Sequence, residues 1–217
     1  MTGNSADRSG IKELCSAPEK LIAHIQHKLA GRTPRSYVFS KKESIPAAVL
    51  LPLFFKEGQA HLLFTKRSNL VEHHKGQISF PGGRRDQGDP DLRFTALRET
   101  EEEVGIRPEH IRLVGRIDRF LTNTYFMVTP FVGFFDFPYP FEVSEAEIER
   151  LIEVPLFHLT DDKQFEIKPF TKNGYTWMVH YYRYQSDVIW GVTGFLLSNF
   201  LSLVFGCHRN IKNYTLS

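Results

Sequence analysis

The chain has few cysteines, no dominant charge sign and no uninterrupted long apolar run, and each shortage excludes a class of protein. Two cysteines, Cys15 and Cys207, stand near opposite ends of the 217 residues. They offer neither a disulfide framework nor a metal-ligand spacing. The formal net charge is +2, whereas bulk nucleic-acid binding favours a strongly basic patch or stripe. We therefore expect free thiols in a reducing compartment and no nucleic-acid partner.

A secretory leader and a membrane partner are not expected either. No charged and then apolar leader opens the chain, and its last residues, YTLS, differ from a Ser-Lys-Leu peroxisomal address. Residues 188–206 are largely apolar and almost long enough to cross a bilayer. Four polar residues interrupt them, and apolar residues such as Leu196, Phe200 and Leu203 recur at helical spacing. A buried helix and a cytoplasmic location are the expectation, with a membrane span as the alternative for this segment.

The composition is that of a globular protein, with 41% hydrophobic and 24% charged residues. Residues 1–10 are polar, and we expect them to be disordered. Ser16 and Glu19 predict a capping box, with Pro18 in the first turn of an amphipathic helix that ends at Gly31. The pattern divides the chain into an N-terminal helical extension, 1–45, and a main domain, 46–217.

Strands dominate the middle of the main domain, and helices interrupt them. Strands are predicted at 47–55, 60–65, 111–119, 126–136, 164–170 and 175–184. The first two are joined by Glu57-Gly58 and are expected to form a hairpin. Residues 144–151 predict an acidic loop or short helix, followed by an edge segment at 154–156. The fold class that follows is an α/β sandwich with a mixed sheet between helices.

The densest chemistry lies at residues 98–106, which read RETEEEVGI. On a helix, Glu99, Glu102 and Glu103 share a face, while Glu101 turns towards solvent. Three carboxylates so close repel one another, and Mg²⁺ or Mn²⁺ would remove the repulsion because these ions prefer oxygen ligands. Arg98 can reach Glu102 one turn later and orient it. The alternative is a solvated acidic helix face.

This stretch resembles the Nudix box, whose core is REUxEExGU with U an apolar residue; Thr100 is a weak U. From Gly83, five residues lead to Asp89, and eight residues separate Asp89 from Arg98, one more than the family pattern. The coenzyme A pyrophosphatase branch of the family is similar in this longer, aspartate-bearing loop. Residues 62–105, LLFTKRSNLVEHHKGQISFPGGRRDQGDPDLRFTALRETEEEVG, follow that branch closely. The chain departs from the branch at Val71, where the branch has Leu, and at Glu72, where a basic residue is common.

The resemblance implies a Mg²⁺- or Mn²⁺-dependent pyrophosphatase with its Nudix box at about 83–106. Its substrate would be coenzyme A or an acyl derivative, and its products 4′-phosphopantetheine and 3′,5′-ADP. Glu99 and Glu103 would be metal ligands, with Glu102 a third ligand or the partner of Arg98. One alternative is a Nudix enzyme for another nucleoside diphosphate derivative. Another is a regulator that binds a nucleotide without cleaving it. A homodimer is expected by analogy alone.

Residues before and after the box are further candidates. Gly82 and Gly83 would let the backbone turn sharply and approach the substrate, although an ordinary hairpin turn is the alternative. The side chains that precede this turn and could line a substrate cleft are Arg67, His74, Lys75 and Gln77.

The general base is left open between two glutamates. Glu147, and with it Glu145, lies in an acidic loop that resembles the region from which many Nudix enzymes draw a base or an extra metal ligand. Surface charge is the alternative reading of that loop, and Glu102 is the alternative base. The aromatic residues Phe120, Tyr125 and Phe126 could stack on adenine or could pack in the core.

Overall fold

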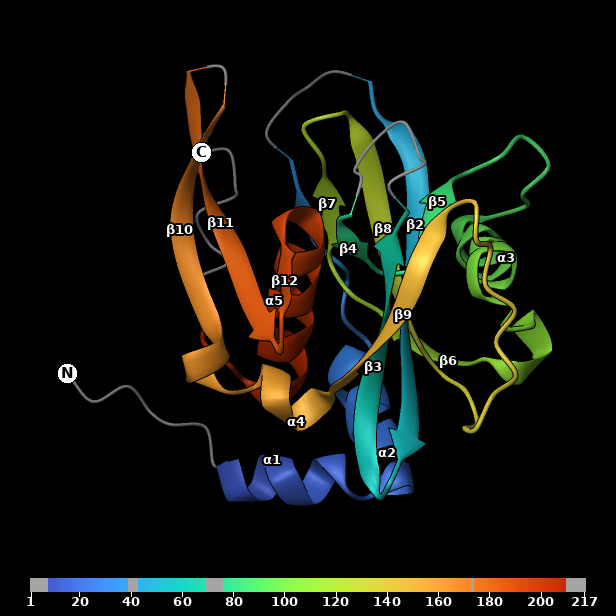
Figure 1. Cartoon of the computed structure of the whole chain (residues 1–217), viewed down its shortest axis with the longest axis vertical. Helices are drawn as coiled ribbons and strands as arrows, with labels where there is room; N and C mark the ends of the chain where they lie inside the picture. Colours follow the sequence, from blue (N-terminus) through green and yellow to red (C-terminus); the bar gives the residue numbers. More distant parts are fainter. Residues whose placement is uncertain (1–7, 39–42, 69–75, 173, 210–217) are drawn as a thin grey trace.

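Figure 1 shows the computed structural model, which describes residues 8–38, 43–68, 76–172 and 174–209. A nine-stranded mixed sheet occupies the centre, and a three-stranded antiparallel sheet stands beside it. The helices are α1 (Arg8–Cys15), α2 (Pro18–Leu29), α3 (Leu92–Val104), α4 (Leu156–Leu159) and α5 (Gly191–Phe205), with short 3-10 turns at Pro108–His110 and Asp162–Gln164. The strands are β1 (Ser36–Tyr37), β2 (Ile45–Lys56), β3 (Gln59–Arg67), β4 (Ile78–Ser79), β5 (Gly82–Arg84), β6 (Arg112–Arg116), β7 (Arg119–Leu121), β8 (Phe126–Phe134), β9 (Ile148–Pro155), β10 (Phe165–Lys172), β11 (Tyr175–Tyr184) and β12 (Asp187–Trp190).

Strand β2 organises the main sheet because it is hydrogen-bonded to three others. It runs parallel to β8 and antiparallel to β3 and β5. The predicted β2–β3 hairpin is confirmed, and Glu57 and Gly58 turn the chain with φ of 51° and 72°. Side chains alternate across a strand, so the two faces of β2 feed two different cores. Leu50 and Phe54 pack with α3, whereas Leu51 packs in the larger core with α1, α2 and α5.

The N-terminal helices join that larger core, and two predictions about them were wrong. Helix α1 begins at Arg8, within the stretch expected to be disordered. The predicted capping box is absent, because the N-cap of α2 is Ala17 without a side-chain hydrogen bond, and the Ser16 hydroxyl donates to the Lys12 carbonyl at 3.0 Å. Pro18 does start the helix. The boundary of a separate extension at residue 45 stays a prediction.

The C-terminal third also departs from the predicted elements. Strand β9 begins at Ile148, where an acidic loop or helix was expected, and pairs along β3. Strand β12 was not anticipated; it pairs with β11 and leads directly into α5. Helix α5 is buried, as predicted for this segment. None of the helices in the described ranges is long and apolar enough to cross a membrane. Cys15 and Cys207 are both free and buried.

Candidate functional site

Helix α3 carries the acidic cluster, and local sequence explains both of its ends. Asp91 caps the N-terminus, where its carboxylate accepts a hydrogen bond from the Phe94 backbone N–H at 2.8 Å. Gly105 ends the helix in the left-handed conformation with φ of 75°, and its N–H donates to the Glu101 carbonyl. Glycine in this conformation is a common C-cap of a helix. These two caps determine where α3 begins and where it ends.

A buried ion pair holds the loop before α3 against the helix. Asp89 is 4% exposed and accepts hydrogen bonds from Arg98 Nε and Nη2, both at 3.0 Å. The Thr95 hydroxyl and the Asp86 backbone N–H donate to the same carboxylate, at 2.8 and 3.0 Å. These donors, the guanidinium above all, hold the pKa of Asp89 well below its usual range. In the sequence Asp89 stands out only as part of a motif, and its spacing from Arg98 is the signal that could have identified this pair.

We expect Arg98→Met to lower the free energy of unfolding at pH 7 by about 1.5–3 kcal/mol, because the variant leaves a buried carboxylate without its cation. The folded-state pKa of Asp89 lies below its unfolded value of 3.8. The stability from this pair is therefore present above pH 3.8 and is lost as pH falls towards the folded pKa. Urea unfolding at pH 7, 5 and 3.5 measures this.

Arg93→Met provides the control, because Arg93 is exposed on the first turn of the same helix. It should change stability by less than about 0.5 kcal/mol at every pH. A difference between Arg98→Met and wild type that stays constant down to pH 3.5 would contradict the ion-pair account.

The four glutamates of α3 separate into two inward and two outward side chains. Glu103 is 4% exposed and Glu99 is half-buried, whereas Glu101 is exposed, as expected. Glu102 was expected to point with Glu99 and Glu103, but its side chain is 58% exposed and accepts a hydrogen bond from Arg98 Nη1 at 2.9 Å. Glu102 is three residues after Glu99 and lies to one side of the helix face that packs on the sheet, so solvent reaches it.

Glu103 is the most perturbed acid of the cluster. Its Oε2 atom is buried without a hydrogen-bond partner among the described residues. Burial, together with the negative charges of Glu99 and Glu147, raises the pKa of Glu103 to about 8, although the nearby Arg67 cation opposes the rise. Burial also raises the pKa of Glu99, against the effect of Arg98, whose Nη2 lies 2.9 Å from Glu99 Oε1. Such electrostatics favour a cation between the two carboxylates.

The glycine turn lies directly against these carboxylates. The Gly82 backbone lies close enough to Glu103 to oppose the rise in its pKa, and Gly82 has φ of 148°, a conformation that only glycine adopts easily. A Cβ atom on Gly83 would stand 2.5 Å from the Glu99 carboxylate. A Cβ atom on Gly82 would meet Ala48 and Val49 of β2 instead, so the start of β5 fits between β2 and Glu99 only because both residues lack a side chain.

The loop before β9 is tied to the same end of α3. The Ser144 N–H donates to the Glu103 carbonyl at 3.0 Å, and the Glu147 N–H donates to the Ser144 carbonyl at 3.0 Å. The Glu147 carbonyl accepts from the Ser68 N–H at 2.7 Å. Glu147 is exposed and close enough for its charge to raise the pKa of Glu103. The acidic loop was predicted from sequence, whereas its attachment through Ser144 was not.

The remaining candidates are less closely gathered. Arg67 lies near Glu103, and its backbone N–H donates to the Gln77 carbonyl at 2.9 Å. Its Nε atom is buried and has no hydrogen-bond partner within the part of the chain that the structure describes. His74 and Lys75 lie outside the described residues. Phe120 is buried and packs on Phe195 with ring centroids 4.4 Å apart, which supports the core-packing alternative.

The donor set fits a hard cation, although the arrangement seen does not assemble three ligands. In the described part of the chain, no three His, Cys, Asp or Glu side chains are grouped closely enough to hold a metal ion. Glu102 instead lies against Arg98. The orphaned Glu103 oxygen and the Glu99 carboxylate packed against Gly83 are nevertheless oxygen donors of the kind that such a cation prefers. The assignment of metal ligands stays a prediction.

Comparison with known proteins places these features in context. The family model described as NUDIX domain matches residues 44–164, which is more than half of the chain. A Mus musculus protein named peroxisomal coenzyme A diphosphatase NUDT7 is 31% identical over 174 residues, which cover 79% of this chain and 74% of the mouse protein. An uncharacterized Nudix hydrolase, NudL, from Photorhabdus laumondii is 34% identical over 151 residues, covering 70% of this chain and 80% of the relative.

Solved structures match over a shorter stretch. A C. elegans Ap4A hydrolase complex is 21% identical with a TM-score of 0.45, and the match covers 51% of this chain and 80% of that one. A MutT protein from Methanosarcina mazei is 23% identical with a TM-score of 0.44, covering 56% and 83%.

Proposed function

The chain belongs to the Nudix hydrolase family, and within that family we propose that it hydrolyses the diphosphate bond of coenzyme A or acyl-coenzyme A. The products would be 4′-phosphopantetheine, or its acyl form, and 3′,5′-ADP. The observation that carries the proposal is the pair of inward carboxylates, Glu99 and Glu103, set against a side-chain-free glycine turn. The similarity to a coenzyme A diphosphatase across most of both chains supports the choice of substrate.

Glu99 and Glu103 would hold Mg²⁺ or Mn²⁺, and such an ion, when bound, supplies charge neutralisation of the diphosphate and a more acidic water. Glu102 would become a third ligand only after leaving Arg98, to which it is hydrogen-bonded. Arg98 also holds Asp89, so it fixes the loop that follows the glycine turn. Arg67, whose charge acts on Glu103, would present its guanidinium to the substrate.

Glu147 is the proposed general base. It would accept a proton from the attacking water while the diphosphate bridge breaks, and the leaving phosphate would depart with its negative charge. Its loop is attached to both α3 and β3 through backbone hydrogen bonds, so the exposed carboxylate can turn towards the acids without unfolding the loop. Glu102 is the alternative base, since it also faces solvent next to Arg98.

A regulator without catalysis is disfavoured by the same geometry. Burying a carboxylate oxygen without a partner costs free energy unless a cation or a ligand meets it. A panel of coenzyme A, NADH, ADP-ribose and dinucleotides, assayed for product release with and without Mg²⁺, separates the possibilities. Hydrolysis of coenzyme A only with the metal supports the proposal. Faster hydrolysis of another member would reassign the substrate, and binding without turnover would indicate a regulator.

The substrate assignment also predicts a preference for coenzyme A over dephospho-coenzyme A. The 3′-phosphate that dephospho-coenzyme A lacks would form charge-assisted hydrogen bonds, and losing one is worth about 1.5–3 kcal/mol. We therefore expect kcat/KM to be roughly ten- to hundredfold higher for coenzyme A. Steady-state rates at matched Mg²⁺ measure the ratio. Equal rates would favour a general nucleotide pyrophosphatase.

Location and assembly are separate proposals. The mouse relative is named peroxisomal, whereas a cytoplasmic location for this chain stays a prediction from its sequence. Homodimerisation also stays a prediction, which the molecular mass in solution at micromolar concentration would test.

A further inference from the structure

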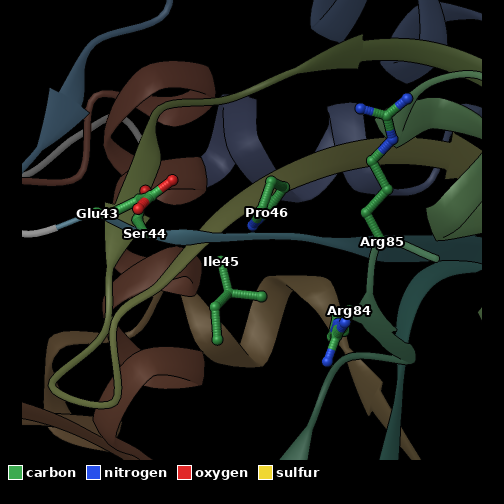
Figure 2. Close-up of a pocket in the computed structure, with 6 residues that line it drawn as sticks. All are labelled: Glu43, Ser44, Ile45, Pro46, Arg84 and Arg85. Carbon is green, nitrogen blue, oxygen red and sulfur yellow. The ribbon is translucent and has the colours of Figure 1, made fainter. Parts of the chain in front are cut away.

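A cavity of about 390 Å³ opens where β2 begins and β5 ends. Figure 2 shows its lining, which comes from two short stretches: Glu43, Ser44, Ile45 and Pro46 on one side, and Arg84 and Arg85 on the other. The lining thus combines two guanidinium groups and the Glu43 carboxylate with an apolar surface, so its cations outnumber its anions. Ile45 is unusual in being 38% exposed for a large hydrophobic residue. This combination suits a ligand that has both an anionic group and a flat, partly apolar body.

The two arginines of the cavity differ in what they already bind. Arg85 donates from Nε and Nη2 to the Asp89 carbonyl, at 3.2 and 2.8 Å, and from Nη2 to the Pro90 carbonyl at 3.0 Å. It therefore closes the loop before α3. Arg84 is exposed, and its guanidinium makes no hydrogen bond or ion pair with any residue in the described ranges. Arg84 is the cation that remains available to a ligand.

The strand register places Arg84 beside the acidic cluster but on the opposite face of β5. Gly83 faces α3, because a Cβ atom there would touch the Glu99 carboxylate. The next residue, Arg84, points to the other face, where it pairs with Ala47 on β2. In Figure 2, Ile45 and Arg84 lie on one side of the β2 ribbon, and Pro46 and Arg85 lie on the other. Arg84 therefore lies one residue along the chain from the glycine that touches Glu99, with its side chain on the opposite face of β5.

The chemistry of a 3′-phosphorylated nucleotide matches this arrangement. Its 5′-diphosphate and its 3′-phosphate are attached to the same ribose, so the second anion must bind close to the first but in a different direction. A phosphomonoester is close to a dianion at neutral pH, and a guanidinium binds such a group through two parallel hydrogen bonds. Ile45, which lies on the same side of β2 as Arg84, offers apolar contact to the nucleoside.

We infer that the cavity receives the nucleoside half of the substrate and that Arg84 pairs with a phosphomonoester on its ribose, the 3′-phosphate of coenzyme A. Arg84 is then a specificity-determining residue, distinct from the carboxylates that act on the diphosphate. This inference rests on the proposed function for the identity of the nucleotide. Three observations are independent of that identity: the side-chain position of Arg84, its lack of a partner among the described residues and the cavity beside it.

The test combines one substitution with one missing substrate group. In Arg84→Gln, kcat/KM for coenzyme A should fall roughly ten- to hundredfold, while kcat/KM for dephospho-coenzyme A should change less than about twofold, because that substrate has no 3′-phosphate to lose. Arg84→Lys, which keeps the charge but not the planar fork, should recover part of the loss. An equal fall for both substrates would show that Arg84 contacts the diphosphate and would overturn the inference, as would no change for either.

Arg116→Gln is the matched control. Arg116 is also an exposed arginine, but it lines a different cavity with Leu113, Gly115 and Phe131. Its removal lowers the net charge by the same amount. It should leave unchanged the ratio of kcat/KM for coenzyme A to kcat/KM for dephospho-coenzyme A. A ratio that falls equally in Arg116→Gln would assign the effect to long-range charge and would overturn a specific role for Arg84.

A binding experiment separates this inference from the proposed activity. Titration calorimetry with 3′,5′-ADP and with 5′-AMP needs no turnover, and wild type should bind 3′,5′-ADP roughly ten- to hundredfold more tightly, a preference that Arg84→Gln should remove. If wild type hydrolyses neither coenzyme A nor its dephospho form, the proposed function fails, yet this preference still decides the role of Arg84. Equal binding of the two nucleotides by wild type would overturn the inference even in an active enzyme.

Discussion

Replacing Glu103 with Gln should lower kcat by several powers of ten while leaving the fold intact. Glu103 is 4% exposed and has a carboxylate oxygen without a partner among the described residues. Glutamine preserves the volume but removes the charge that would face the metal-bound diphosphate, and loss of the main electrostatic contribution has effects of this size. Single-turnover rates at saturating Mg²⁺ measure the loss. A variant with near wild-type turnover would exclude Glu103 as a metal ligand.

The same variant has a stability signature that does not depend on turnover. The folded-state pKa of Glu103 is about 8 against an ordinary value of 4.5. Folded protein therefore loses stability as pH rises from 4.5 through about 8, because the unfolded chain ionises this group first. Glu103→Gln removes that loss, so the metal-free variant should have a higher Tm than wild type at pH 8 and an equal Tm below pH 4.5.

Addition of Mg²⁺ should raise the Tm of wild type at pH 8 and should raise that of Glu103→Gln much less, because a ligand that binds only the folded state stabilises it. Glu101→Gln is the control, since Glu101 is exposed on the same helix. It should retain activity and the full response to Mg²⁺. A control that loses both would indicate that the helix as a whole, rather than Glu103, attracts the cation.

Replacing Glu147 with Gln should lower kcat by about 10²–10⁴-fold, the usual contribution of a positioned general base. KM and Mg²⁺ affinity should stay nearly unchanged, because Glu147 is placed to accept a proton rather than to hold the substrate. The limb of the rate profile that rises with pH should change in the variant, since that limb reports ionisation of the base. Profiles of kcat against pH at saturating Mg²⁺ provide the measurement.

Glu145→Gln is the matched control for the base, because Glu145 is an exposed glutamate two residues earlier in the same loop. It should leave kcat within about twofold of wild type if the base is Glu147. Loss of kcat in Glu145→Gln alone would transfer the role to Glu145. Unchanged kcat in both variants would return the loop to surface charge and make Glu102 the preferred base.

Local interactions explain why several features were predictable from the sequence. Gly105 ends α3, and Glu57-Gly58 turns the β2–β3 hairpin, because a few neighbouring residues determine backbone conformation at such positions. The apolar spacing of residues 188–206 likewise predicted a buried helix. The capping box at Ser16 failed because the Ser16 hydroxyl donates back to Lys12 at the end of α1, a helix that the polar composition of residues 1–10 did not suggest.

The sequence alone determined that a helix of acids follows a double glycine, and membership of the Nudix family followed from forty-odd spaced residues. Tertiary structure decided which acids are buried. Helical spacing grouped Glu102 with Glu103, but packing of α3 on β2 and β5 buried Glu103 and left Glu102 with Arg98. Tertiary structure also decided that Arg85 is hydrogen-bonded to the Asp89 carbonyl, whereas Arg84 faces a cavity. Burial and free hydrogen-bonding capacity depend on residues distant in the chain, so no local pattern could specify them.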